Sequence, residues 1–120
     1  MWILRSSPTP DTAAFTFRVG PGGLKTVGRA VRADFIVEAA LVSRFHCRLS
    51  AGADGLLRVE DLGSTNGTFV NDRRIQHATL VPGDRLRVGR VELIVSHNTS
   101  PELEPESIDE FDDVDELTAD

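Results

Sequence analysis

The feature that most constrains this chain is the short interval between its turn signals. Apolar and polar residues alternate in brief runs, such as AFTFRV (14–19), LLRVED (56–61) and VELIVS (91–96). Clusters rich in Gly, Pro, Asn and Asp separate these runs, at 20–23, 51–55, 63–67 and 82–84. Short alternating runs with frequent turns are typical of sandwiches and barrels of strands, and no stretch before residue 98 carries the apolar stripe of a helix. We therefore expect an all-β fold.

The net charge of −6 conceals two segments of opposite sign. All 13 Lys and Arg residues lie between Arg5 and Arg90, and subtracting the 9 Asp and Glu residues of positions 1–98 leaves +4 there. Residues 99–120 hold 10 acidic residues and no basic one. Such a segment cannot bury enough apolar surface to offset the entropy lost on ordering. We expect a folded domain at residues 1–97 and a disordered acidic tail at residues 98–120.

Several classes of site are excluded by residue type. Cys47 is the only cysteine, so neither an internal disulfide nor a cysteine-based metal cluster can form, and the three histidines are scattered without a pattern of carboxylates. No apolar run approaches the roughly 20 residues that span a bilayer, and the start MWILRSSPTP lacks the pattern of a secretory signal. We expect an intracellular protein that uses no metal, no cofactor and no membrane.

Catalysis and nucleic-acid binding are also poorly supported. His46 and Cys47 are adjacent, and neighbours on a strand point to opposite faces, so they cannot share a proton directly. The segment GPGGLKT (20–26) lacks the Gly-Lys-Ser/Thr end of a phosphate-binding loop. The few aromatic residues suit a core better than a platform for bases. We therefore predict no catalytic residues, no enzyme activity and no direct contact with nucleic acid.

Three short motifs remain, each next to a predicted strand. They are Gly28-Arg29 in VGR (27–29), Ser43 to His46 in SRFH, and GSTNGTFVN (63–71). An arginine can fork onto an oxyanion, and serine and threonine hydroxyls can donate to the same group. Asparagine both donates and accepts, which suits binding to a peptide main chain. Together these residue types describe a pocket for a phosphorylated peptide.

At these residues the chain resembles the forkhead-associated (FHA) domain family, whose members bind phosphothreonine. The resemblance covers about residues 2 to 96 and implies a sandwich of two antiparallel sheets with about eleven strands and ligand-binding loops at one end. It implies that Arg29 and Ser43 bind the phosphate and that Thr65 assists them. It also implies that Arg44 flanks the phosphate or the peptide, and that Asn66 holds the peptide main chain. Structural support of the site is assigned to Gly28, His46, Gly63, Ser64 and Gly67, with His46 bracing the pocket from behind.

A narrower likeness is to the N-terminal domain of nibrin-like DNA-repair proteins. It rests on the start MWIL and on the segment GTFVNDRRIQ (67–76). This likeness implies a nuclear role in DNA damage signalling. If the protein is not nibrin-like, we expect it in the cytoplasm.

Two functions from different classes are therefore open. The first is a non-enzymatic adaptor that binds phosphothreonine-containing proteins, with acidic residues around the phosphosite because the domain is basic. The alternative is a structural or self-associating module whose basic face binds its own or another acidic tail. Within the tail, Ser107 precedes acidic residues and resembles a kinase site, and Ile108, Phe111, Val114 and Leu117 recur at every third position.

Overall fold

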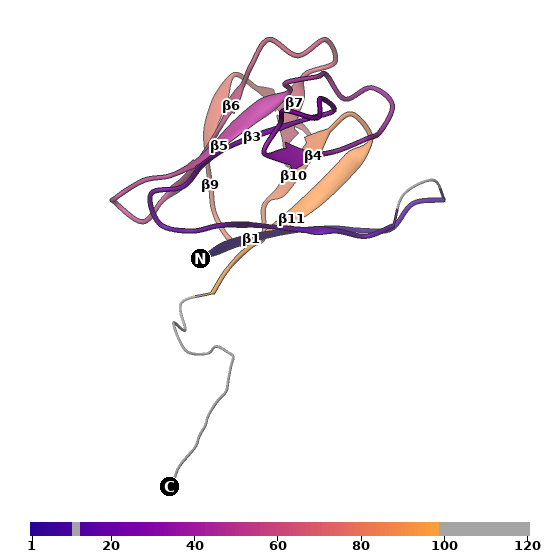
Figure 1. The fold of residues 1–120 in the computed structure, drawn as a ribbon. Coiled ribbons are helices and arrows are strands. Elements are labelled where there is room, and N and C mark those ends of the chain that lie inside the picture. The colour runs from indigo at the N-terminus through magenta and orange to yellow at the C-terminus, as the bar shows by residue number, and fades with distance from the viewer. Residues whose placement is uncertain (11–12, 99–120) are drawn as a thin grey trace, which may run out of the picture.

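The computed structural model describes residues 1–10 and 13–98 and contains two β-sheets packed against each other (Figure 1). The six-stranded sheet has the order β2-β1-β11-β10-β7-β8, and the five-stranded sheet has the order β4-β3-β5-β6-β9. The strands are β1 (Trp2–Ser6), β2 (Thr16–Val19), β3 (Leu24–Gly28), β4 (Phe35–Ile36), β5 (Cys47–Ala51), β6 (Leu57–Asp61), β7 (Thr68–Val70), β8 (Arg73–Ile75), β9 (His77–Leu80), β10 (Arg85–Val88) and β11 (Val91–His97). The expected all-β sandwich of eleven strands is confirmed.

Strand pairing is antiparallel with one exception among the described residues. The short strand β4 runs parallel to β3, with Val27 opposite Phe35 and Gly28 opposite Ile36. The first and last strands, β1 and β11, pair in the middle of the six-stranded sheet. The last described strand ends at His97, and apart from Asn98 the expected acidic tail, with Ser107, lies outside the described residues.

The core lies between the sheets and follows directly from the alternation in the strands. Leu4, Leu86 and Leu93 from one sheet meet Leu49 and Leu57 from the other, and all five are fully buried. Each fully buried leucine stabilises the fold by roughly 1.5–3 kcal/mol relative to an exposed one. The core therefore holds the two sheets as a rigid frame for the loops that join them.

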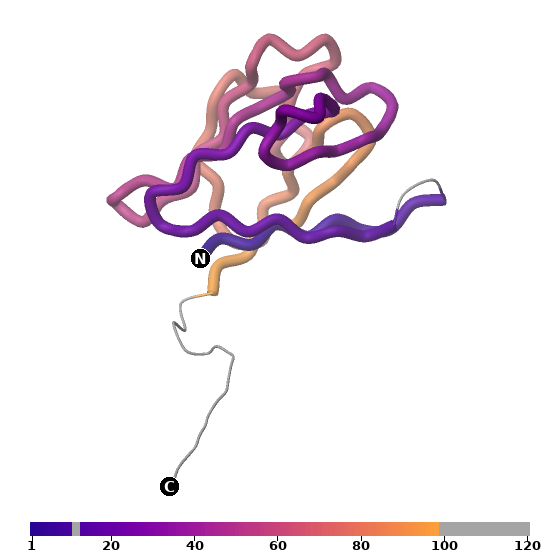
Figure 2. The backbone as a smooth tube through the Cα atoms, in the orientation of Figure 1, coloured from indigo at the N-terminus to yellow at the C-terminus, as the bar shows by residue number. Residues whose placement is uncertain are grey.

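The connections between strands gather at two ends of this frame. The segments that follow β3, precede β5 and join β6 to β7 emerge at one end, beside the turn between β10 and β11. The turns at 20–23 and 51–55 lie at the other end, where Met1 and Asn98 also lie side by side (Figure 2). Residues 37–46, the longest strand-free segment within residues 13–98, thus face the loop 62–67.

Gly28 lets the segment before β5 pack directly on the end of β3. A Cβ atom at this position would lie 2.0 Å from the carbonyl oxygen of Arg44, which is far inside van der Waals contact. Backbone hydrogen bonds from Arg29 to Ser43 (3.0 Å) and from Ala30 to Arg44 (3.0 Å) fix this approach. The φ of Gly28 is not positive, so the backbone conformation does not require glycine here. The lack of space for a side chain does.

We expect Gly28→Ala to destabilise the domain, because the new methyl group must displace the backbone around Arg44. Overpacking of this kind costs about 1 to 3 kcal/mol. The matched control is Gly20→Ala, where a Cβ would meet nothing within 4 Å. Urea unfolding of both variants measures the difference. Equal free energies of unfolding for the two variants would contradict the close approach at Gly28.

Candidate functional site

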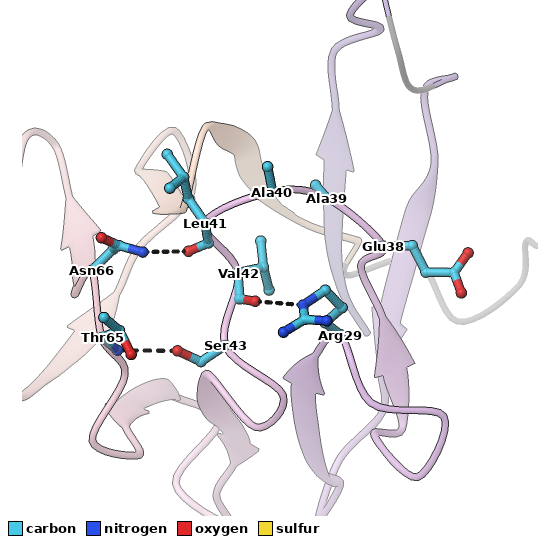
Figure 3. A pocket seen from close by; sticks show the side chains of 9 residues that line it. All are labelled: Arg29, Glu38, Ala39, Ala40, Leu41, Val42, Ser43, Thr65 and Asn66. Carbon is cyan, nitrogen blue, oxygen red and sulfur yellow. Dashed lines mark hydrogen bonds between the residues drawn. The ribbon is translucent and has the colours of Figure 1, made fainter.

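An open pocket of about 660 Å³ lies between the segment 37–46 and the loop 62–67 (Figure 3). Its lining residues are Arg29, Glu38, Ala39, Ala40, Leu41, Val42, Ser43, Thr65 and Asn66. Four of the five ligand-binding residues expected from the sequence are therefore brought to one place. The fifth, Arg44, is exposed and is not among the lining residues.

Arg29 enters the pocket from the end of β3. Its Nε–H donates to the carbonyl oxygen of Val42 (3.0 Å), and its backbone N–H donates to Ser43 (3.0 Å). Among the described residues the guanidinium forms no ion pair, and the carboxylate of Glu38 points away from it (Figure 3). The side chain is therefore oriented by one nitrogen while its two terminal nitrogens keep their donors for a ligand.

Two hydrogen bonds join the two loops across the pocket. The Oγ atom of Ser43 accepts from the backbone N–H of Thr65 (3.0 Å), and the amide of Asn66 donates to the carbonyl of Leu41 (3.1 Å), as Figure 3 shows. Because Ser43 accepts through a lone pair, its hydroxyl hydrogen is still available to a ligand. Leu41 has φ 71°, an unusual conformation for a leucine, and it aims this carbonyl at Asn66.

His46 is fully buried and connects the same two loops from inside the domain. Its Nδ1 accepts the backbone N–H of Ser43 (3.0 Å), and its Nε2 lies 2.8 Å from the carbonyl oxygen of Gly67. Since Nδ1 accepts, the ring hydrogen must reside on Nε2, which donates to Gly67. The imidazole does not line the pocket, and it contacts the backbone of residues on both sides of it.

Asp61 organises the loop 62–67 and was not recognised from the sequence. One carboxylate oxygen accepts the backbone N–H groups of Gly63 (3.0 Å) and Ser64 (3.1 Å). The other accepts the hydroxyls of Ser64 and Thr68 (2.7 Å to the latter). Partial burial alone would raise the pKa of Asp61, but these hydrogen bonds outweigh it and hold the pKa below its ordinary value.

Ser64 and two glycines complete this loop. Ser64 is buried, and its hydroxyl oxygen accepts the backbone N–H of Gly67 (3.0 Å). Gly63 has φ 75° and Gly67 has φ 89°, values that other residues seldom adopt. Ser64 thus turns its side chain into the loop, and Thr65 and Asn66 are left at the surface.

Sequence reasoning also missed Glu38, Ala39 and Ala40 on the pocket wall, because small side chains and a single acid carry no recognisable signal. Asp61 did have one, since an Asp two residues before Gly63 can close a turn with its own side chain. Cys47 is buried, and burial raises the pKa of its thiol to about 12, so it is inert as a nucleophile. No group of metal-ligating side chains occurs within residues 1–10 and 13–98.

We expect Asp61→Asn to destabilise the domain by about 1.5 to 3 kcal/mol at neutral pH, because hydrogen bonds to a charged group are lost. The folded-state pKa of Asp61 lies below the ordinary value of 3.8, so its stabilisation is complete above pH 3.8 and is lost as pH falls through the lower pKa. Urea unfolding of both proteins between pH 2 and 7 should therefore show the two converging in acid. A constant difference at every pH would contradict this role.

The family model described as FHA domain matches residues 25–89. The glycogen accumulation regulator GarA of Mycolicibacterium smegmatis is 35% identical over 71 residues, which cover 58% of this chain and 43% of the regulator. The chain therefore spans less than half the length of GarA, and it spans 48% of an oxoglutarate dehydrogenase inhibitor from Corynebacterium diphtheriae.

Solved structures agree with this match. The crystal structure of the FhaA FHA domain in complex with the intracellular domain of Rv3910 has a TM-score of 0.70 and 30% identity, and covers 80% of this chain and 100% of that one. A structure from an analysis of phosphothreonine-dependent FHA domain interactions has a TM-score of 0.69 and 29% identity, and covers 82% and 98%. The narrower likeness to nibrin-like repair proteins finds no support among these relatives. The chain belongs to the forkhead-associated domain family.

Proposed function

We propose that this domain binds phosphothreonine-containing peptides in the pocket between segments 37–46 and 62–67. The observation that carries the proposal is the state of the Arg29 side chain. Its Nε donates to the carbonyl of Val42, and its other nitrogens form no ion pair with any described acid. Arg29 lines the pocket together with Ser43, whose hydroxyl can bind the same ligand. A forked cation next to a hydroxyl matches the charge and the acceptor oxygens of a phosphate. The FHA structure determined in a phosphothreonine-dependent interaction study supports the same ligand class.

The pocket residues take distinct roles in this proposal. Arg29 and Ser43 bind the phosphate, and the exposed hydroxyl of Thr65 assists them. Asn66 uses its carbonyl oxygen and its second N–H for the peptide main chain, since one N–H already binds Leu41. Arg44 flanks the ligand from outside the pocket. His46, Asp61 and the loop glycines keep these groups in position.

The residues around the phosphothreonine should be selected by charge. The described domain carries an excess of basic residues, which favours acidic peptides in general. Glu38, however, lies on the pocket wall next to Ala39 and Ala40. A peptide residue that passes Glu38 should therefore be neutral or basic, and acidic residues should be tolerated on the side of Arg44.

The role is that of a non-enzymatic adaptor whose ligand is made by protein kinases, so it would operate inside the cell. No helix among the described residues has the length and apolar character needed to cross a membrane. A role in DNA damage signalling and a nuclear location receive no support from GarA and the oxoglutarate dehydrogenase inhibitor, which are bacterial proteins.

We expect Arg29→Ala to weaken phosphothreonine-peptide binding on the order of 100-fold or more, because charge-assisted hydrogen bonds are worth about 1.5 to 3 kcal/mol each. Arg29→Lys keeps the charge but loses the fork, so it should recover only part of the affinity. Ser43→Ala should cost about 1.5 to 3 kcal/mol, since one donor to a charged group is removed. Calorimetry with a peptide selected from a degenerate phosphothreonine library measures all three.

Arg73→Ala is the matched control. It removes the same charge at the end of β8 that lies away from the loop 62–67. It should bind as the parent does. The same peptide with phosphoserine should bind more weakly by about 0.8 kcal/mol or more, the value of one buried methyl group, and the unphosphorylated peptide should not bind. Equal affinity of Arg29→Ala and the parent, or equal binding without phosphate, would refute the proposed function.

We expect Glu38→Gln to change selectivity while phosphate binding is retained. Peptides that differ only by Asp or Lys at one position should reveal a position where the parent prefers Lys, and the variant should lose this preference. The effect should be about 0.2 to 1 kcal/mol, as for exposed charge pairs. Glu60→Gln, outside the pocket, is the control. An unchanged Lys preference in Glu38→Gln at every position would remove Glu38 from peptide selection.

A further inference from the structure

Several basic side chains gather on the outer face of the six-stranded sheet. Leu4, Leu86 and Leu93 point into the core, so their neighbours along the strands point away from it. The outward residues include five arginines, namely Arg5, Arg18, Arg74, Arg85 and Arg87. We call the surface that these arginines share the outer sheet face.

Strand register makes this surface continuous. Arg5 and Arg85 lie directly opposite Ile94 on its two sides, in the centre of the sheet. Arg87 lies opposite Phe69, and its guanidinium carbon is 4.2 Å from the centre of the Phe69 ring. Ile94 is 40% exposed. The outer sheet face therefore presents an exposed apolar centre among cations.

The charge on this face is not balanced within the described chain. Arg85 pairs with Asp72 at 3.0 Å and with Glu92 at 3.5 Å. Arg5, Arg18, Arg74 and Arg87 form no ion pair with any acid in residues 1–10 and 13–98. Unpaired cations around an exposed isoleucine suit a ligand that is acidic and partly apolar.

A segment of this chemistry is attached to the same sheet. Residues 99–120 hold 10 acidic residues and no basic one, and they include Ile108, Phe111, Val114 and Leu117. Strand β11, which carries Ile94, ends at His97, about 10 Å along the strand from it. Thirteen residues lie between His97 and Phe111, and a random-coil chain of that length has a mean span of about 20 Å. The segment can therefore reach the outer sheet face.

We propose that residues 99–120 dock on the outer sheet face of their own chain, with acidic side chains on Arg5, Arg18 and Arg87 and an apolar side chain on Ile94. Attachment raises the effective concentration of the segment to the millimolar range, so weak contacts suffice. None of the residues that line the phosphopeptide pocket belongs to this face. The docking site is thus separate from the pocket, and the proposal does not depend on the function assigned to it.

Paramagnetic broadening in the full chain tests the docking. Thr118→Cys places a spin label in the segment, and the buried Cys47 does not react. We expect amide signals of residues around Arg5, Arg87 and Ile94 to broaden, while those of Ser50 and Arg58 on the other sheet stay sharp. In about 1 M salt, where the screening length is near 3 Å, the broadening should disappear.

Two charge-matched variants show which arginines are responsible. Arg5→Gln with Arg87→Gln should abolish the broadening, and Arg48→Gln with Arg58→Gln on the other sheet should leave it intact. Spin-labelled chain mixed with isotope-labelled chain that lacks the label should show no broadening. Broadening that is absent, equal on both sheets, centred on Arg29 and Ser43, unchanged by the Arg5 and Arg87 substitutions, or present in the mixed sample would overturn the proposal.

Discussion

The buried imidazole of His46 is the contact on which the site depends. Its two nitrogens bind the backbone of Ser43 and of Gly67, so one side chain sets the distance between the two loops that form the pocket. The imidazole is fully buried, so the loss of either bond would leave one of its nitrogens unpaired away from water. Two further residues support the loops. Gly28 allows one loop to pack on the end of β3, and Asp61 binds the other through three hydrogen bonds, with a fourth to Thr68 of β7.

This arrangement prepares the pocket before a ligand arrives. Arg29 is already held by Val42, and the loops are already tied by the bonds from Thr65 to Ser43 and from Asn66 to Leu41. Ordering loops and long side chains is a major cost of binding, and here much of it is met by folding. The left-handed backbone of Leu41 fits the same pattern, because local strain persists only where surrounding contacts hold it.

The domain separates two kinds of surface. The pocket lies at the ends of strands, where loops can present single donors in chosen directions. The outer sheet face presents charge and apolar area across the six-stranded sheet, with Arg5, Ile94 and Arg85 in one cross-strand row. The first surface suits one compact anion, and the second suits an extended acidic segment. Both can be occupied in one molecule because the sandwich keeps them apart.

Much of the fold was readable in the sequence, because alternation along a strand and turn chemistry are local properties. The alternating runs around Leu49, Val59 and Leu93 predicted an all-β sandwich. The motifs at Arg29, Ser43 and Asn66 indicated the family and the candidate pocket residues. The roles of these residues in binding remain a prediction. Local signals did not reveal that Glu38 and Ala40 line the pocket while Arg44 does not, and they did not reveal the hydrogen bonds of Asp61. They also did not show that Arg5 and Arg85 flank Ile94.

The sequence by itself determined strands, turns and the chemistry of the pocket, whereas only the tertiary structure decided which side chains became neighbours. The physical reason is that β1 and β11, like the two pocket loops, meet through pairings between residues distant in the chain, and no local pattern encodes such pairings.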